Sequence, residues 1–221
     1  MADHIALSVV MVTRNERGSV ESVVKSIQAV APEAEILIVD SSDDDTAARA
    51  ESLGCKVIRQ FPPQGYGPAL GLALRSAGGD VIITMDCDGT YPVEAILRLK
   101  KCIVDGAELA SANRLRDKPK HMPLSNYAAN KLFAVLARVI CGLEVADLHT
   151  GMRAYRKELI QSFEFDANGM ALPVELVLGP MKKGHRHWQI DIDYFERIGQ
   201  SKLDPIKGTY WTLKRVWKFR R

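Results

Sequence analysis

Four short apolar segments alternate with segments of helical periodicity in the first half of the chain, and this alternation limits the fold more than any other feature. The apolar segments are IALSVVMVT, EILIVD, KVIRQ and DVIITM, and the first is followed by the helical pattern SVESVVKSIQAVA. Strands that are apolar throughout and alternate with helices are typical of a mostly parallel sheet covered on both faces. We therefore predict an α/β fold with a mostly parallel central sheet flanked by helices.

Polar side chains follow three of these predicted strands. They are Thr13, Asn15 and Glu16 after the first strand, Asp40 after the second, and Asp86 and Asp88 after the fourth. In sheets of this kind, ligands bind beyond the carboxyl ends of the strands. We therefore expect these side chains to converge on one edge of the sheet.

The stretch TMDCDGTYP places two aspartates, Asp86 and Asp88, one residue apart after a buried strand. Two ionised carboxylates this close repel each other unless a positive charge lies between them. Mg²⁺ or Mn²⁺ prefers carboxylate oxygens and completes its shell with water and substrate phosphate, so the pair suggests a metal that holds a diphosphate. The alternative is structural, with Asp86 capping the strand and Asp88 opening an Asp-Gly turn at Gly89.

Two glycines, Gly65 and Gly67, precede Pro68 at the start of a predicted helix in QGYGPALGLAL. They would allow the backbone to approach a ligand closely at a helix N-terminus. The chain contains no GxGxxG and no GxxxxGK[ST] pattern, so the dinucleotide-binding and P-loop families lose their main support.

The composition points to a single reduced domain. The chain has 221 residues and a net charge of +3, and its four cysteines are scattered without a CxxC pair, which disfavours disulfides and zinc. The N-terminus lacks the basic stretch of a signal peptide, and no apolar run is long enough to span a bilayer. We expect a cytoplasmic protein, or one held peripherally on the cytoplasmic face of a membrane.

The pattern changes in the second half of the chain. LRDKPKHMP indicates a connection, and SNYAANKLFAVLARVICG predicts a long helix whose apolar residues cover more than one narrow face. HRHWQIDIDYFER predicts a late strand, and PIKGTYWTLKRVWKFRR predicts a cationic amphipathic helix. The last two helices either cover the core or rest partly on lipid or a partner chain.

Six motifs in order carry a resemblance to a known family. VVMVTRNE, ILIVDSSDDDT, QGYGPALGLAL with DVIITMDCDGTYP, ASANR, DLHTGMRAYRKEL and ERIGQSKL resemble the GT-A glycosyltransferases of family 2 over nearly the whole chain. The likeness is greatest to the dolichyl-phosphate mannosyltransferase and bacterial polyprenyl-phosphate sugar transferase branch. It implies a GT-A, Rossmann-like fold and inverting transfer from a GDP-mannose or UDP-hexose type of donor, with Mg²⁺ or Mn²⁺, to polyprenyl or dolichyl phosphate.

The resemblance also implies site residues. The nucleoside pocket would involve Thr13, Asn15, Glu16, Asp40 and Asp86, with Gly65 and Gly67 nearby, and the metal would involve Asp86, Asp88 and Thr90. The phosphate and acceptor groups would be Arg114, Lys131, Arg153, Arg197, Ser201 and Lys202. Asp147 and Glu175 would orient the acceptor or act as base. Thr90 stands where many of these enzymes have a glutamine, which implies more water on the metal. Each arginine could instead form an ordinary ion pair.

The implied organisation is a catalytic domain over residues 1–205, divided into a nucleotide-sugar half at 1–112 and an acceptor half at 113–205. A basic amphipathic helix at 206–221 would follow as a C-terminal extension. The expected partners are a nucleotide-sugar donor and a lipid-phosphate or small-molecule acceptor, with an anionic membrane surface and a second copy of the chain as further partners. Nucleic acid is not expected.

Three other functions stay open at this point. One is transfer to a soluble hydroxyl acceptor in secondary metabolism or glycan synthesis, which unlike a lipid phosphate needs a base. Another is a sugar-phosphate nucleotidyltransferase, although TRNERGSVES lacks the glycine-rich activating loop of such enzymes. The last is an inactive scaffold with a basic tail that binds nucleic acid or lipid, which the intact acidic pair argues against.

Overall fold

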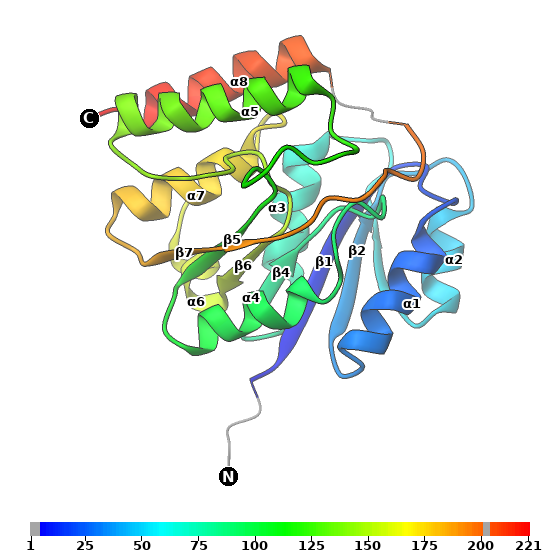
Figure 1. Cartoon of the computed structure of the whole chain (residues 1–221). Helices are drawn as coiled ribbons and strands as arrows, with labels where there is room; N and C mark the ends of the chain where they lie inside the picture. The colour runs from blue at the N-terminus through cyan, green and yellow to red at the C-terminus, as the bar shows by residue number, and fades with distance from the viewer. Residues whose placement is uncertain (1–4, 201–203) are drawn as a thin grey trace.

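The computed structural model describes residues 5–200 and 204–221 and shows a twisted sheet between layers of helices (Figure 1). Within these residues the sheet has seven strands in the order β3-β2-β1-β4-β6-β5-β7. The strands are β1 (Leu7–Thr13), β2 (Glu35–Asp40), β3 (Lys56–Arg59), β4 (Val81–Thr84), β5 (Leu109–Asn113), β6 (Arg153–Arg156) and β7 (His187–Asp191). The predicted α/β fold with a flanked central sheet is confirmed.

The first four strands pair in parallel, as their apolar alternation with helices predicts. β1 pairs with β2 and with β4, and β2 pairs with β3. The helices that follow these strands, one after each, are α1 (Val20–Val30), α2 (Thr46–Ser52), α3 (Tyr66–Ser76) and α4 (Ala95–Val104). The carboxyl ends of β1, β2 and β4 therefore share one edge of the sheet.

β1 shows why these strands carry apolar residues at every position. Val9 and Met11 pack into a core on the side of α1 and α4, whereas Val10 packs into a second core on the side of α3. All three side chains are completely buried. Because successive residues of a strand point to opposite faces, a sheet covered on both faces needs apolar residues throughout.

β6 is the exception in the sheet, because it runs antiparallel to both of its neighbours, β4 and β5. Its four residues, RAYR, give no apolar run, and the sequence did not predict this strand. The antiparallel direction places the first residue, Arg153, beside Thr84 at the end of β4. The loop before β6 therefore reaches the edge where the aspartate pair lies.

The second half adds α5 (Leu124–Leu136), which continues into a π-helical turn η1 (Ala137–Cys141), then α6 (Lys157–Ser162), α7 (Leu172–Lys182) and α8 (Pro205–Lys218). Figure 1 shows α5 and α8 side by side above α7. α8 buries Thr212, Arg215 and Val216. The segment expected as a C-terminal extension at 206–221 is therefore packed into the fold. Among the described helices, none has both the length and the apolar content that crossing a bilayer requires.

Candidate active site

The loop after β4 holds the two aspartates of the DxD pattern. Asp88 is almost fully buried, and its Oδ1 accepts hydrogen bonds from the amide of Thr90 (3.0 Å) and from its hydroxyl (2.6 Å). Gly89 between them has a φ of 77°. The Asp-Gly turn that was the structural alternative for this stretch is therefore present. It fixes Oδ1 of Asp88 and leaves Oδ2 for another partner.

Oδ2 of Asp88 faces a segment from the end of the chain. Arg197 Nη2 lies 2.6 Å from it, an ion pair whose geometry falls short of a hydrogen bond. The same segment pairs with the loop through its backbone, because the amide of Phe195 donates to Thr90 (3.0 Å) and that of Ile198 to Asp88 (2.8 Å). Residues 195–198 therefore lie across the aspartate pair.

The carboxyl group of Asp86 binds its proton more tightly than an ordinary aspartate, because its pKa is raised. Burial, and next the charge of Asp88, raise its pKa to about 6, although Arg114 and Arg197 act in the opposite direction. From the described residues, its carboxylate receives no hydrogen bond. A Cβ on Gly151 would lie only 2.9 Å from Asp86 Oδ2, so a larger residue at position 151 would collide with that carboxylate. A carboxylate without donors beside a second carboxylate is the environment that a cation would neutralise.

The chemistry of this pair fits a hard divalent cation. No group of three or more acidic, histidine or cysteine side chains gathers around one point in the described part of the chain. Two carboxylates with the remaining positions left to water and substrate phosphate is the arrangement usual for Mg²⁺. Asp86 and Asp88 would hold the ion, whereas the hydroxyl of Thr90, predicted as a metal ligand, donates to Asp88 and orients it.

The predicted nucleoside residues meet at the ends of β1 and β2. Thr13 Oγ1 donates to Asp40 (2.7 Å), and the amide of Asn15 donates to Ser42 Oγ (2.7 Å). Ser42 donates twice to Asp40, through its hydroxyl (2.6 Å) and its amide (3.0 Å), and Arg59 donates once (2.6 Å). With Thr13, four donors occupy the carboxylate, which is its full capacity. Asp40 therefore shapes this edge through contacts within the protein, and its predicted place in the nucleoside pocket stays a prediction.

The turn between β1 and α1 is held by the same neighbouring loop. The amide of Glu16 donates to Thr46 Oγ1 (2.9 Å), and Asn15 has a positive φ of 56°. Asparagine tolerates this left-handed conformation better than most residues. The turn from Thr13 to Glu16 thus lies at the predicted edge, next to the loop after β2.

The two glycines before α3 have different roles. Gly65 has a φ of 106° and precedes the first residue of α3. A Cβ on Gly67 would meet the carbonyl oxygens of Ala167 and Gly169 at 2.1 and 2.2 Å. Gly67 therefore admits a neighbouring loop of the chain itself, and its predicted place near the nucleotide stays a prediction.

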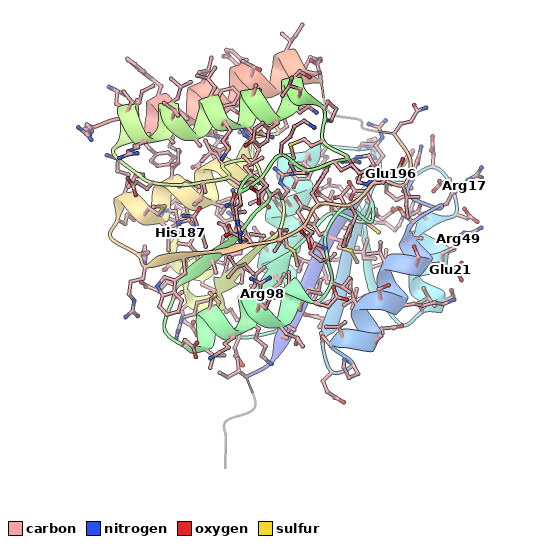
Figure 2. All side chains as sticks on the ribbon, in the orientation of Figure 1. Arg17, Glu21, Arg49, Arg98, His187 and Glu196 are labelled. Atoms are coloured by element: carbon pink, nitrogen blue, oxygen red, sulfur yellow. The ribbon has the colours of Figure 1, made fainter. Side chains whose placement is uncertain are left out.

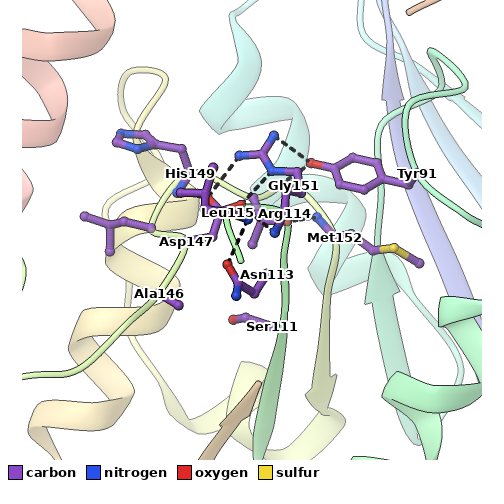
Figure 3. A network of polar contacts seen from close by, with 12 residues as sticks. Tyr91, Ser111, Asn113, Arg114, Leu115, Ala146, Asp147, His149, Gly151 and Met152 are labelled. Carbon is purple, nitrogen blue, oxygen red and sulfur yellow. Dashed lines mark hydrogen bonds and ion pairs between the residues drawn. The ribbon is translucent and has the colours of Figure 1, made fainter. Parts of the chain in front are cut away.

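Arg114 and Asp147, predicted in separate roles, bind each other (Figure 3). Asp147 Oδ2 lies 2.6 Å from Nε and Oδ1 lies 3.0 Å from Nη2, and both side chains are buried. The rings of Tyr91 and Tyr194 lie 5.9 and 5.4 Å from the guanidinium. Burial alone would raise the pKa of Asp147, but the charge and hydrogen bonds of Arg114 outweigh it and leave the pKa below its usual value. A carboxylate in this state is a poor general base.

Arg153 and Glu175 also lie in surroundings that differ from the predicted ones. Arg153 is buried and donates to Ser111 Oγ (3.1 Å) and to the carbonyls of Pro173 (2.6 Å) and Leu148 (2.8 Å). These contacts make it part of the core, and its predicted role in binding phosphate is not supported. His187 Nε2 lies 3.0 Å from the same Ser111 hydroxyl.

Glu175 lies on α7, fully buried, and faces two cations of α8. Its Oε2 is 2.9 Å from Arg215 Nη1, and its Oε1 is 2.7 Å from Lys218 Nζ. Arg215 also pairs with Asp166 at 3.0 Å. Through these contacts Glu175 holds α8 against α7, and its surroundings do not support the predicted role as a base.

Two further predicted positions complete the set. Lys131 lies on α5 with its Nζ 5.6 Å from the ring centroid of Tyr127. Ser201 and Lys202 fall outside the described residues. Tyr91 is a further residue of the site that was not predicted. Its hydroxyl accepts a hydrogen bond from the amide of Gly151 (2.7 Å) and so links the loop after β4 to the loop before β6. Its place in TYP, directly after the aspartate pair, is the signal that could have found it.

Comparison with known proteins places these observations in a family. The pattern of glycosyl transferase family 2 matches residues 8–163. A dolichyl-phosphate hexose transferase of Haloferax volcanii is 40% identical over 203 residues, which cover 91% of this chain and 88% of the relative. An undecaprenyl-phosphate mannosyltransferase of Micrococcus luteus is 25% identical over 227 residues, with 93% of each chain covered.

The fold has experimental counterparts. The structure of glucosyl-3-phosphoglycerate synthase from Mycobacterium tuberculosis with Mn²⁺, UDP-glucose and phosphoglyceric acid superimposes with a TM-score of 0.75 at 20% identity, covering 98% of this chain and 80% of that one. This likeness supports the expected GT-A fold. From the family match and the relatives together, the chain belongs to glycosyl transferase family 2 and is a glycosyltransferase.

Proposed function

We propose that this chain transfers a hexose from a nucleoside diphosphate sugar to a polyprenyl or dolichyl phosphate, with inversion at the sugar carbon. The observation that carries the proposal is the pair of carboxylates Asp86 and Asp88 at the carboxyl end of β4, of which only Asp88 has an ion-pair partner among the described residues. Relatives named for dolichyl-phosphate and undecaprenyl-phosphate transfer support the acceptor class. The donor class is GDP-mannose or a UDP-hexose.

In this proposal Asp86 and Asp88 hold Mg²⁺ or Mn²⁺, and Thr90 fixes the orientation of Asp88. The ion supplies Lewis-acid stabilisation of the departing nucleoside diphosphate. Arg197, now paired with Asp88, is released from that carboxylate when the charge of the pair is neutralised, and its guanidinium then binds the diphosphate of the donor. Residues 195–198 cover the site and exclude water from it.

The ion pairs of Asp147 and Glu175, the two predicted bases in the second half of the chain, support a phosphate acceptor. A sugar or alcohol hydroxyl needs a base to remove its proton, whereas a lipid phosphate is already an anion near neutral pH. Asp147 is bound by Arg114, and Glu175 is bound by Arg215 and Lys218, so both predicted bases are neutralised by cations. An acceptor that needs no deprotonation suits a site whose predicted bases are occupied.

Such an acceptor places the enzyme at a membrane. We propose that it works at the cytoplasmic face, where nucleotide sugars are present, and that it reaches the lipid phosphate peripherally.

The test measures incorporation of radiolabelled sugar from GDP-mannose, UDP-glucose and related donors into a polyprenyl phosphate, with Mg²⁺ or Mn²⁺, in detergent. A parallel reaction offers phosphoglyceric acid as a soluble acceptor. We expect metal-dependent labelling of the lipid with one donor class and none of the soluble acceptor. Labelling of the soluble acceptor alone, or transfer that survives exhaustive chelation, would overturn the proposal.

A further inference from the structure

Two stripes of exposed apolar side chains run along neighbouring helices. Of the fourteen large apolar side chains that are exposed in the described residues, eight lie on α5, η1 and α8. They are Leu124, Leu132, Val135 and Val139 on α5 and η1, and Ile206, Tyr210, Leu213 and Trp217 on α8. Within each stripe the residues recur mostly at intervals of three and four, which places them along one side of each helix.

The two helices form one outer layer. They lie side by side and run in the same direction in Figure 1. Their ends are joined by hydrogen bonds from the amide of Arg221 to the carbonyl of Ile140 (3.0 Å) and from Cys141 Sγ to the carbonyl of Val216 (3.2 Å). The inner face of α8 is buried in the core, so its outer stripe has no partner within the described chain. We call this outer surface the α5–α8 face.

The charge on these segments is one-sided. Residues 118–143 and 205–221 contain ten of the 30 lysines and arginines of the chain and none of its 27 aspartates and glutamates. The rest of the chain, with 20 basic and 27 acidic residues, is therefore negative. On α1 and α2, by contrast, Glu21 and Arg49 mix both signs in one exposed pair (Figure 2).

Arg215 and Lys218 on α8 are paired with Glu175, but Lys214 on α8 and Arg220 just after it stand beside the half-buried ring of Trp211 and the exposed ring of Trp217. Lys214 Nζ lies 4.7 Å from the ring of Trp211, and the guanidinium carbon of Arg220 lies 5.1 Å from that of Trp217. Tryptophan beside lysine or arginine next to an aliphatic stripe is the composition of helices that lie in the headgroup layer of a membrane.

We infer that the α5–α8 face docks on the surface of an anionic lipid bilayer. The inference rests on the proposed lipid-phosphate acceptor and adds the surface by which the chain reaches it. A second copy of the chain is disfavoured as the occupant, because the same cationic segments would face each other. Nucleic acid is disfavoured because six of the eight exposed apolar side chains of the face are aliphatic and offer neither hydrogen bonds nor stacking to bases.

The face is also joined to the site. The ring of His149 lies 5.0 Å from that of Phe133 on α5, and its Nε2 lies 2.8 Å from Thr212 Oγ1 on α8. From His149 the chain continues to Gly151, which packs against Asp86. The loop that carries His149 and Gly151 therefore contacts the inner sides of α5 and α8 and also Asp86. Docking of the α5–α8 face would hold the acceptor phosphate of the membrane near the site.

Co-sedimentation of the full chain with vesicles tests this inference. Vesicles of phosphatidylcholine alone are compared with vesicles that also contain phosphatidylglycerol, at low and high salt. We expect binding to the anionic vesicles that falls with salt, and at least about tenfold weaker partitioning for the double variant Ile206→Ser, Trp217→Ser, since these side chains bury apolar surface in the bilayer. A truncation at Gly208 is unsuitable because α8 buries Thr212, Arg215 and Val216.

The matched control is Leu97→Ser, Val104→Ser, which removes two exposed apolar side chains from α4, away from the α5–α8 face. We expect it to sediment like the unchanged chain. Equal sedimentation of both double variants, or no binding to anionic vesicles at low salt, would overturn the inference. A dimer in sedimentation equilibrium that only Ile206→Ser, Trp217→Ser dissociates would also overturn it and make the face a contact between copies.

The docking face and the proposed function fail in different ways. Transfer to polyprenyl phosphate in detergent without vesicle binding would overturn the face alone. Vesicle binding without any transfer to the lipid would overturn the function alone.

Discussion

Two carboxylate clusters of this chain have similar parts and opposite charge balance. In the cluster beside α8, each oxygen of Glu175 lies next to a cation, and Asp166 receives the amide of Asn168 and a guanidinium nitrogen of Arg215. In the loop after β4, Asp88 has one arginine nitrogen and its own turn, and Asp86 receives no hydrogen bond from the described residues. The first cluster is neutralised by the protein, whereas the second is not.

One aspartate in each cluster has a shifted pKa, and the two shifts are in opposite directions. The amide of Asn168 and then Arg215 lower the pKa of Asp166 to about 2, whereas burial and Asp88 raise that of Asp86 to about 6. Removing a carboxylate even partly from water is costly unless it is paired, so the half-buried and unpaired Asp86 suggests a partner from outside the chain. A carboxylate cluster that the protein's own cations neutralise has a structural role, whereas one that they leave unneutralised is a candidate binding site.

The largest expected effect comes from Asp86→Asn and Asp88→Asn. Each removes one charge from the proposed metal clamp, so we expect sugar transfer to fall by about 1,000-fold, the equivalent of about 4 kcal/mol. Melting temperature should be maintained, because neither change creates a cavity. The control is Asp105→Asn, which removes an exposed carboxylate paired with Lys101. Full activity in either site variant, with metal still required, would remove that residue from the clamp.

Glu175→Gln should affect stability and not chemistry. The change leaves the buried Arg215 with Asp166 as its single carboxylate and deprives Lys218 of its partner, so it should lower the free energy of unfolding in urea by about 3 kcal/mol. We expect kcat per folded molecule to stay within about twofold of the unchanged enzyme, since the residue is not placed at the reacting atoms. Glu158→Gln, an exposed position on α6, is the control. A stable variant with strongly reduced kcat would restore Glu175 as a catalytic group.

The opposite pKa shifts predict a smaller, pH-dependent effect in the metal-free protein. The folded state holds the Asp86 proton more tightly than the unfolded state, so ionisation of Asp86 costs stability as the pH rises from about 4 to 6. Asp166 behaves in the reverse way, and its contribution is lost as the pH falls from about 4 towards 2.

Urea unfolding across pH 3–7 measures both effects. Asp86→Asn should remove the stability lost between pH 4 and 6, and Asp166→Asn should weaken the loss of stability below pH 4. Carboxyl NMR titration of the metal-free protein assigns each group directly. Similar titration of the two aspartates would contradict the difference in charge balance.

The smallest expected effect is a change in metal affinity. Arg197 neutralises part of the charge on Asp88, so Arg197→Gln should strengthen binding of Mn²⁺ in the absence of nucleotide by about fivefold, the equivalent of about 1 kcal/mol. Electron paramagnetic resonance of free Mn²⁺ measures it. Arg116→Gln, whose guanidinium pairs with Asp117 and Asp191 on the surface, should leave the affinity unchanged. Weaker binding in Arg197→Gln would show that Arg197 does not compete with the ion.

The edge of the sheet where the site lies could be predicted from sequence, because it follows from periodicity. Apolar runs that alternate with helices imply parallel strands, and parallel strands bring the residues after β1, β2 and β4 to one edge. Thr13, Asp40 and Asp86 lie there for that reason. The strand β6 left no such signal, since it has only four residues, two of them arginines.

The roles of individual charged residues could not be predicted in the same way. Whether Asp147 is a free base depends on Arg114, and whether Glu175 is one depends on Arg215, and each partner is more than thirty residues away in sequence. Gly67 likewise depends on the carbonyls of Ala167 and Gly169. Such pairings leave no periodic pattern in the sequence. Motif positions therefore identify candidate site residues but do not show which of them are already bound to another part of the protein.

The antiparallel direction of β6 has a consequence for the order in which the chain is assembled during synthesis. It brings Gly151 to Asp86, and the segment with Arg197 reaches Asp88 from near the end of the chain. A ribosome releases the aspartate pair long before either contact exists, and domains are completed as their later segments emerge. A nascent chain that has emerged only to residue 150 would therefore carry both carboxylates but lack Gly151 and residues 195–198, which shape their site. It would gain the complete site only after residue 198 has emerged.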